Sequence, residues 1–180
     1  MRRWWLILVS LLALSVAVQG QNCDTLETPF SETFDGYGTG ASLMPPCWTA
    51  TRNYDLGYPP HLMASPHGGS GSALVLYPGT LAESHYSMVI APPVGGLASL
   101  DGIYLVMRIL APNTSARLVV GLCQDTGRYT RAFVPVDTLH VDQGNRWQEV
   151  VVDLGAYTGT GRRVALRMDR GLQADSSEFY

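Results

Sequence analysis

The sequence contains no lysine. All twelve basic residues are arginines, and fifteen Asp and Glu residues outnumber them, so the formal net charge at pH 7 is -3. The protein therefore has no lysine for a Schiff base with a carbonyl substrate and no P-loop lysine for a nucleotide phosphate. A nucleic-acid-binding domain normally presents a basic face, so this composition, with only 15% charged residues, argues against a nucleic-acid partner.

The chain also lacks an apolar stretch of comfortable membrane-spanning length at its N-terminus. The apolar run at residues 4–18 is shorter than the about 20 residues that a spanning helix needs. Arg2 and Arg3 precede the run and small residues follow it, a pattern typical of a secretory signal peptide over residues 1–20; an uncleaved anchor helix is the alternative. Removing the two arginines would leave one module over residues 21–180 with a net charge of -3 - 2 = -5. We therefore expect a secreted or outer-cell-surface protein with no membrane span after cleavage.

Cysteines are few, and their number is odd. Cys23 and Cys47 lie in segments rich in proline and glycine, whereas Cys123 ends an apolar, strand-like run. Since export permits disulfides, we predict a Cys23–Cys47 bridge and a free, buried Cys123. Closing that separation of 24 residues would stabilise the fold by ~3 kcal/mol in the chain-entropy model. A metal site is the alternative, and the lack of a CxxC pair or a histidine cluster speaks against it.

Long segments with the 3.6-residue period of a helix are absent from residues 21–180, and short β-rich runs recur instead. Spacing of roughly ten residues, with Gly and Pro between the runs, is typical of an antiparallel sandwich or barrel. The runs are residues 72–77, 85–91, 103–110, 117–123, 129–136, 147–154, 164–168 and 177–180.

Alternation within one run predicts its buried face, because successive side chains of a strand point to opposite sides. Gln148, Val150, Val152 and Leu154 share the side that we expect to face the core.

The first third of the exported chain is less regular. Residues 28–34 and 47–52 resemble two strands around a glycine-rich connection, and residues 53–71, with three prolines and many glycines, predict a long loop. Long loops in compact domains often carry function.

The order of several segments resembles a jelly-roll module of secreted Bacteroidetes proteins. The module is similar to the cleaved-adhesin domains of gingipains, to choice-of-anchor modules and, more distantly, to MAM domains. The resemblance implies an all-β, antiparallel β-sandwich (jelly roll) lacking its last strand, which would continue beyond Tyr180. It covers residues 22–180 through Pro29–Asp35, Leu43–Trp48, Gly71–Leu76, Ser87–Pro92, Val119–Gly121, Phe133–Thr138 and Trp147–Leu154.

The same resemblance implies a calcium site. Related modules place an acidic residue of the first strand on Ca²⁺ together with partners from the last strand, and Glu32 and Asp35 stand at that position here. An acidic pair with a purely structural role is the alternative.

Catalytic motifs are lacking. No Gly-x-Ser-x-Gly elbow occurs, and the nearest match, at residues 69–73, precedes a strand and not a helix. We expect no enzyme activity, and we expect a binding or adhesion module that recognises a glycan or a surface protein. The alternative is an accessory domain of a larger secreted hydrolase or peptidase.

The predicted loop supplies the candidate ligand site. Tyr54 and Tyr58 would offer flat faces to a sugar ring, and Asn53 and Asp55 would supply hydrogen-bonding groups. The simpler alternative is a loop that covers one end of the sandwich with its tyrosines packed inward.

Overall fold

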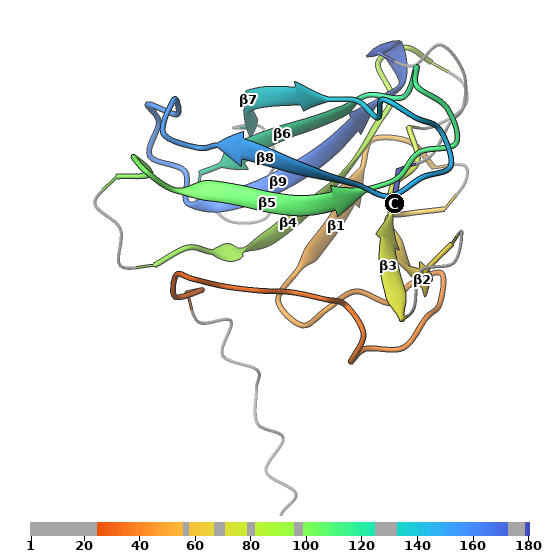
Figure 1. Ribbon diagram of the computed structural model, residues 1–180, viewed down its shortest axis with the longest axis horizontal. Helices are drawn as coiled ribbons and strands as arrows, with labels where there is room; N and C mark the ends of the chain where they lie inside the picture. The colour runs from red at the N-terminus through yellow and green to blue at the C-terminus, as the bar shows by residue number, and fades with distance from the viewer. Residues whose placement is uncertain are drawn as a thin grey trace, which may run out of the picture.

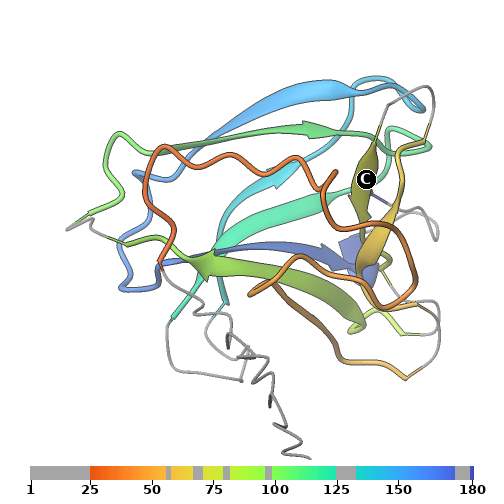
Figure 2. The same ribbon diagram turned by 90° about the horizontal axis from the view of Figure 1, so that it is seen from below.

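The structure is a computed structural model that describes residues 25–55, 58–66, 71–78, 82–95, 99–124, 133–172 and 179–180. These residues form two layers of antiparallel strands packed face to face, as Figure 1 and the perpendicular view of Figure 2 show. The predicted signal peptide (1–20) and Cys23 lie outside the described residues.

One layer is a five-stranded antiparallel sheet. Its strand order is β1-β4-β9-β6-β7. Most adjacent strands of this sheet are therefore not consecutive in the chain, and the connections cross between the layers. The strands are β1 (Thr49–Arg52), β4 (Tyr86–Pro93), β6 (Leu118–Cys123), β7 (Phe133–Leu139) and β9 (Arg163–Asp169).

The second layer consists of two antiparallel pairs, β2 with β3 and β5 with β8. Their bounds are β2 (His61–Ala64), β3 (Ser72–Val75), β5 (Tyr104–Ile109) and β8 (Gln148–Asp153). A short 3-10 helix, η2 (Arg170–Leu172), follows β9 and is the one helix among the described residues.

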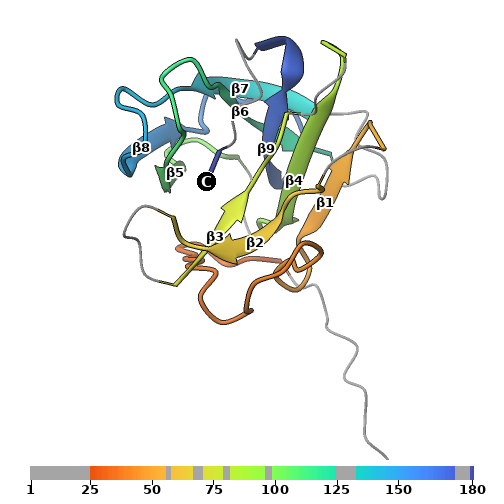
Figure 3. The same ribbon diagram turned by 90° about the vertical axis from the view of Figure 1, so that its right-hand side faces the viewer.

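Phe179 and Tyr180 connect the two pairs of this layer. The backbone of Phe179 exchanges two hydrogen bonds with Leu76, directly after β3, at 2.9 and 3.1 Å. The backbone of Tyr180 exchanges two with Leu110, directly after β5, at 2.9 and 3.0 Å. Figure 3 shows this end of the chain between β3 and β5.

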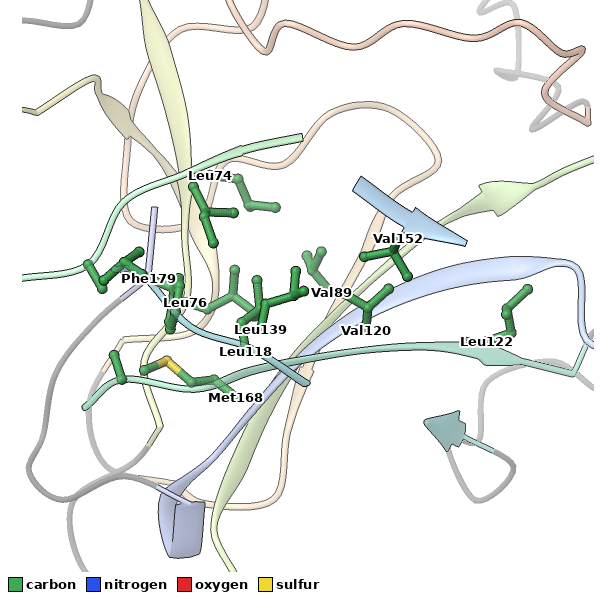
Figure 4. Close-up of a cluster of buried hydrophobic side chains, with 14 of the residues drawn as sticks. Leu74, Leu76, Val89, Leu118, Val120, Leu122, Leu139, Val152, Met168 and Phe179 are labelled. Carbon is green, nitrogen blue, oxygen red and sulfur yellow. The ribbon is translucent and has the colours of Figure 1, made fainter. Parts of the chain in front are cut away.

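The core lies between the layers and follows from side-chain alternation. On β6, Leu118, Val120 and Leu122 point inward and are at most 2% exposed. From the other layer, Val152 and Phe179, each 1% exposed, pack against the same cluster (Figure 4). The inward face predicted for residues 148–154 is confirmed, since Val150, Val152 and Leu154 join the core while Val151 is 58% exposed.

The prediction of an all-β, antiparallel sandwich is confirmed, and most of the predicted runs overlap observed strands. Residues 28–34, however, form no strand. Phe34 adopts a positive φ of 63°, and its N–H donates a hydrogen bond of 2.7 Å to the Glu32 carboxylate. The backbone therefore turns at this residue and does not extend.

The predicted long loop over residues 53–71 is also corrected, because it contains β2. Only four residues long and flanked by prolines, β2 carries little pattern of its own. It is held by pairing with β3, and Leu62 at its centre is fully buried. Whether a further strand belongs to the module stays a prediction.

Cys123 is a free, buried thiol, as predicted. Cys47 is disulfide-bonded, and its predicted partner Cys23 lies outside the described residues, so the pairing itself stays a prediction. Among the described residues, no helix has the length and apolar character needed to cross a bilayer.

Burial predicts how Cys123 reacts. It raises the pKa of the thiol and keeps the reactive thiolate scarce and inaccessible. We expect a maleimide to label no cysteine of the native protein and one cysteine after denaturation without reductant, as counted by intact-protein mass spectrometry. Rapid labelling of the native protein, or three labels after denaturation, would contradict the assignment.

Gly121 predicts a site of tight packing in the five-stranded sheet. A Cβ there would lie 2.6 Å from the Phe133 ring and would also meet the carbonyl of Val134. Gly121→Val should therefore lower the free energy of unfolding by about 1–3 kcal/mol through overpacking.

Gly36→Ala is the matched control, because a Cβ at Gly36 meets nothing within 4 Å. We expect this variant to stay within ~0.5 kcal/mol of the wild type in urea denaturation. Equal midpoints for the two variants would contradict the packing argument.

Candidate functional site

A cluster of aromatic and imidazole rings lies where β2 begins and β3 ends. His61 and Tyr77 stack with ring centroids 5.8 Å apart and an interplanar angle of 19°. The Tyr58 ring is tilted against both of these rings, with its centroid 5.9 Å from that of His61 and 6.1 Å from that of Tyr77. The Tyr58 residue is nevertheless 60% exposed, so this ring offers an open face.

The strand pairing brings these rings together. His61 is the first residue of β2 and pairs with Val75, the last residue of β3, which places Tyr77 two residues beyond the pair. The His61 ring is 8% exposed and its Nδ1 lies 2.8 Å from the carbonyl oxygen of Pro59, so Nδ1 carries the proton and donates it. This bond fixes the orientation of the imidazole beneath Tyr58.

The backbone carbonyl of Tyr77 also makes hydrogen bonds within the protein. It accepts hydrogen bonds from the hydroxyls of Tyr54, at 3.1 Å, and Ser87. The backbone of Tyr77 is therefore hydrogen-bonded to Tyr54, which follows β1, and to Ser87 of β4, so both bonds reach the opposite layer.

Tyr54 is a packing residue in this structure. It is 7% exposed, its ring stacks on His85 at 5.3 Å, and the Arg52 guanidinium lies 5.3 Å from its centroid. Burial raises the pKa of its hydroxyl, which favours the neutral form that donates to Tyr77. Tyr54 thus lacks the exposed face that the sequence hypothesis assigned to it, because His85 and Arg52 pack against its ring.

The side-chain amide of Asn53 also makes hydrogen bonds within the protein. The amide group donates to the carbonyl of Ser84 at 2.8 Å and accepts from the N–H of Tyr86 at 2.7 Å. These bonds join the end of β1 to the start of β4. Asn53, Asp55 and Tyr58 are exposed, so Tyr54 is the one buried residue among the four predicted site residues.

His61 and Tyr77 were missed by the sequence hypothesis. They lie 16 residues apart, and neither stands in a motif; only the β2–β3 register brings them under Tyr58. A period-2 pattern in residues 61–64 would have been the one local signal, and four residues are too few to show it.

The acidic pair suggested for calcium makes hydrogen bonds within the protein. The two Glu32 carboxylate oxygens accept from the Phe34 N–H at 2.7 Å and the Tyr37 hydroxyl at 2.9 Å. Asp35 Oδ1 accepts from the Ser72 N–H at 2.9 Å and occupies the space where a Cβ at Gly71, whose φ is 82°, would stand.

Three of the four carboxylate oxygens of this pair thus accept hydrogen bonds from the protein itself. Within the part of the chain that the structure describes, no three His, Cys, Asp or Glu residues are grouped to hold a metal ion. The arrangement fits a structural role of the pair, and calcium binding stays an untested prediction.

The fold is similar to that of solved adhesin domains. The K1 cleaved adhesin domain of Lys-gingipain from Porphyromonas gingivalis W83 superposes with a TM-score of 0.59 at 18% identity, over 83% of this chain and 92% of that one. The K2 cleaved adhesin domain of Lys-gingipain gives 0.54 at 16% identity, over 84% and 98%.

These superpositions confirm the resemblance to the cleaved-adhesin fold that the sequence indicated. A weaker likeness, with a TM-score of 0.46 and 14% identity, links 77% of this chain to 88% of TmCBM61, solved with β-1,4-galactotriose. No family model and no curated protein matches the sequence. At such identities the likeness establishes the fold alone.

The contrast between the two tyrosines gives a prediction about stability. Tyr54→Ala removes a buried ring and should cost about 3–5 kcal/mol of unfolding free energy. Tyr58→Ala removes an exposed ring and should cost less than ~1 kcal/mol. Chemical denaturation of both variants measures the difference, and equal losses would show that Tyr58 is also a packing residue.

Proposed function

We propose that this protein is a non-catalytic binding module, secreted or displayed on the outer cell surface, that recognises a glycan on the open face of Tyr58. One observation carries the proposal: a ring that is 60% exposed rests against two others, His61 and Tyr77, at 5.9 and 6.1 Å. Many exposed tyrosine side chains can rotate freely. The contacts with His61 and Tyr77 restrict the rotation of the Tyr58 ring.

A supported aromatic face suits a sugar. A pyranose ring has an apolar C–H face that packs on an aromatic ring and a polar rim that needs hydrogen-bonding groups. Pro59 and Pro60 directly follow Tyr58 and restrict the backbone, so that little conformational entropy is lost when a ligand orders the site. The exposed carboxylate of Asp55, three residues before Tyr58, is the nearest acidic group along the chain for the polar rim.

The similar fold of two gingipain adhesin domains supports a binding role. Both of those domains are adhesin domains, and the extension of that role to this chain is part of the proposal. The N-terminal pattern of residues 1–20 supports export, and no catalytic motif in the sequence calls for an enzyme.

Retention on immobilised glycans tests the proposal. We expect the purified protein to bind at least one glycan of an array that includes plant and bacterial polysaccharides. Tyr58→Ala should weaken that binding at least tenfold, while Tyr58→Trp retains it, because the stacking face is kept.

Tyr104→Ala is the matched control. Tyr104 is as exposed as Tyr58, at 59%, but lies on β5, away from the ring cluster. Glycan binding should be unchanged in this variant. The proposal is wrong if the wild type binds no glycan, or if Tyr58→Ala binds glycan no more weakly than Tyr104→Ala does.

A further inference from the structure

The outer face of the β5–β8 pair has an exposed apolar centre. Side chains of both strands that alternate with the outward ones pack against the core, so the residues between them point away from it. Three of these outward residues are large, apolar and more than half exposed: Tyr104 at 59%, Val106 at 57% and Val151 at 58%. Figure 1 shows β5 and β8 side by side, with this face toward the viewer. A further strand beside β5 would lie in the plane of this layer and would leave the face uncovered.

The outward residues of the two strands form complementary rows. The antiparallel register pairs Tyr104 with Asp153, Val106 with Val151, and Arg108 with Glu149. Directly paired residues of two antiparallel strands point to the same side of the sheet. Each row therefore holds a matched pair: a phenol hydroxyl and a carboxylate, two valines, and a guanidinium and a carboxylate. We call these six residues the outer face.

The charged groups of one row are not paired with each other. The Arg108 guanidinium lies over the Trp147 ring, 5.9 Å from its centroid. In the described ranges, neither Arg108 nor Glu149 has an ion-pair partner within 4 Å. Both residues are exposed, so both charges are available to a group outside the chain.

A second copy of the chain supplies the groups that this face requires. Rotation by 180° about an axis parallel to the strands lays β5 of one copy over β8 of the other and keeps every row at its own height. Tyr104 of one copy then meets Asp153 of the other, Val106 meets Val151, and Arg108 meets Glu149. The symmetry makes each of these contacts twice, and no like charges are brought together.

We propose that the outer face is a self-association surface on which two copies of this chain pack face to face about such a twofold axis. The valines form the apolar centre of the interface, and the charged rows at its two ends set the orientation of the copies. The surface shares no residue with the glycan site, so either proposal can fail without the other.

The size of the face predicts a weak dimer. Each strand has six residues, which extend over about 20 Å, and the two strands lie about 5 Å apart. Such a face is smaller than the about 800 Å² that each partner buries in a standard interface, so we expect a dissociation constant of about 0.1–1 mM. At the low micromolar concentrations of a glycan array the protein is then mainly monomeric, and the Tyr104→Ala control keeps its meaning.

Sedimentation equilibrium over a range of protein concentrations tests the proposal. We expect the wild-type protein to form dimers as its concentration approaches about 1 mM. Val151→Glu places a carboxylate in the apolar centre and should raise the dissociation constant at least tenfold. Val134→Glu is the matched control, because Val134 is 42% exposed on β7 of the other layer, and this variant should associate as the wild type does.

Charge reversal tests the orientation of the two copies. Arg108→Glu and Glu149→Arg should each weaken self-association at least tenfold, because each one brings like charges together twice. A mixture of the two variants should associate again, since every carboxylate of one chain then meets a guanidinium of the other. The variant with both substitutions should dimerise by itself. All these side chains are exposed, so we expect melting temperatures within a few degrees of the wild type.

Three results would overturn the proposal. They are a wild type that stays monomeric at about 1 mM, an effect of Val151→Glu no larger than that of Val134→Glu, and a mixture of the two charge variants that associates no better than each variant alone. The last result would exclude the twofold axis parallel to the strands even for a protein that dimerises. If Val151→Glu unfolds, the mixture still decides.

Discussion

Burial of one face of each sheet against the other is the constraint on which the rest of this structure depends. In β6 the constraint selects Leu118, Val120 and Leu122, and in β8 it selects Val152, all at most 2% exposed. In β5 and β8, whose residues between the inward ones point outward, the same packing places Val151 and Val106 on the outside, directly paired with each other. The exposed apolar side chains of the second layer are thus a consequence of its register.

The two ends of the sandwich obey a different requirement. Strands stop there, and their backbone groups need partners that the sheets no longer supply. The side chain of Asn53 accepts a hydrogen bond from the Tyr86 N–H and donates one to the Ser84 carbonyl, and Asp35 accepts one from the Ser72 N–H. Polar residues in irregular segments resemble ligand-binding groups in a sequence, yet several of them here complete the fold.

One aromatic surface beside β2 and β3 is left open after these structural demands. It is the ring of Tyr58, which is 60% exposed and lies against His61 and Tyr77.

The sequence by itself determined the fold class, the strands from β3 to β9 and the inward face of β8, because period-2 patterns and Gly or Pro turns are local signals. It also indicated that Cys123 would be buried, from the apolar run around it. The sequence could not locate β2, whose four residues are stabilised by β3, or reveal that Phe34 turns the chain where a strand seemed to run.

Of the candidate site, the sequence predicted an exposed ring at Tyr54, which the structure buries, whereas Asn53, Asp55 and Tyr58 are exposed. Exposure depends on which segments close over a side chain, and those segments, around Tyr77 and His85, are distant in the chain. Tertiary structure alone decided two features: the contacts of Tyr58 with His61 and Tyr77, and the position of Phe179 and Tyr180 between β3 and β5. Both depend on pairing between residues that are far apart in the sequence.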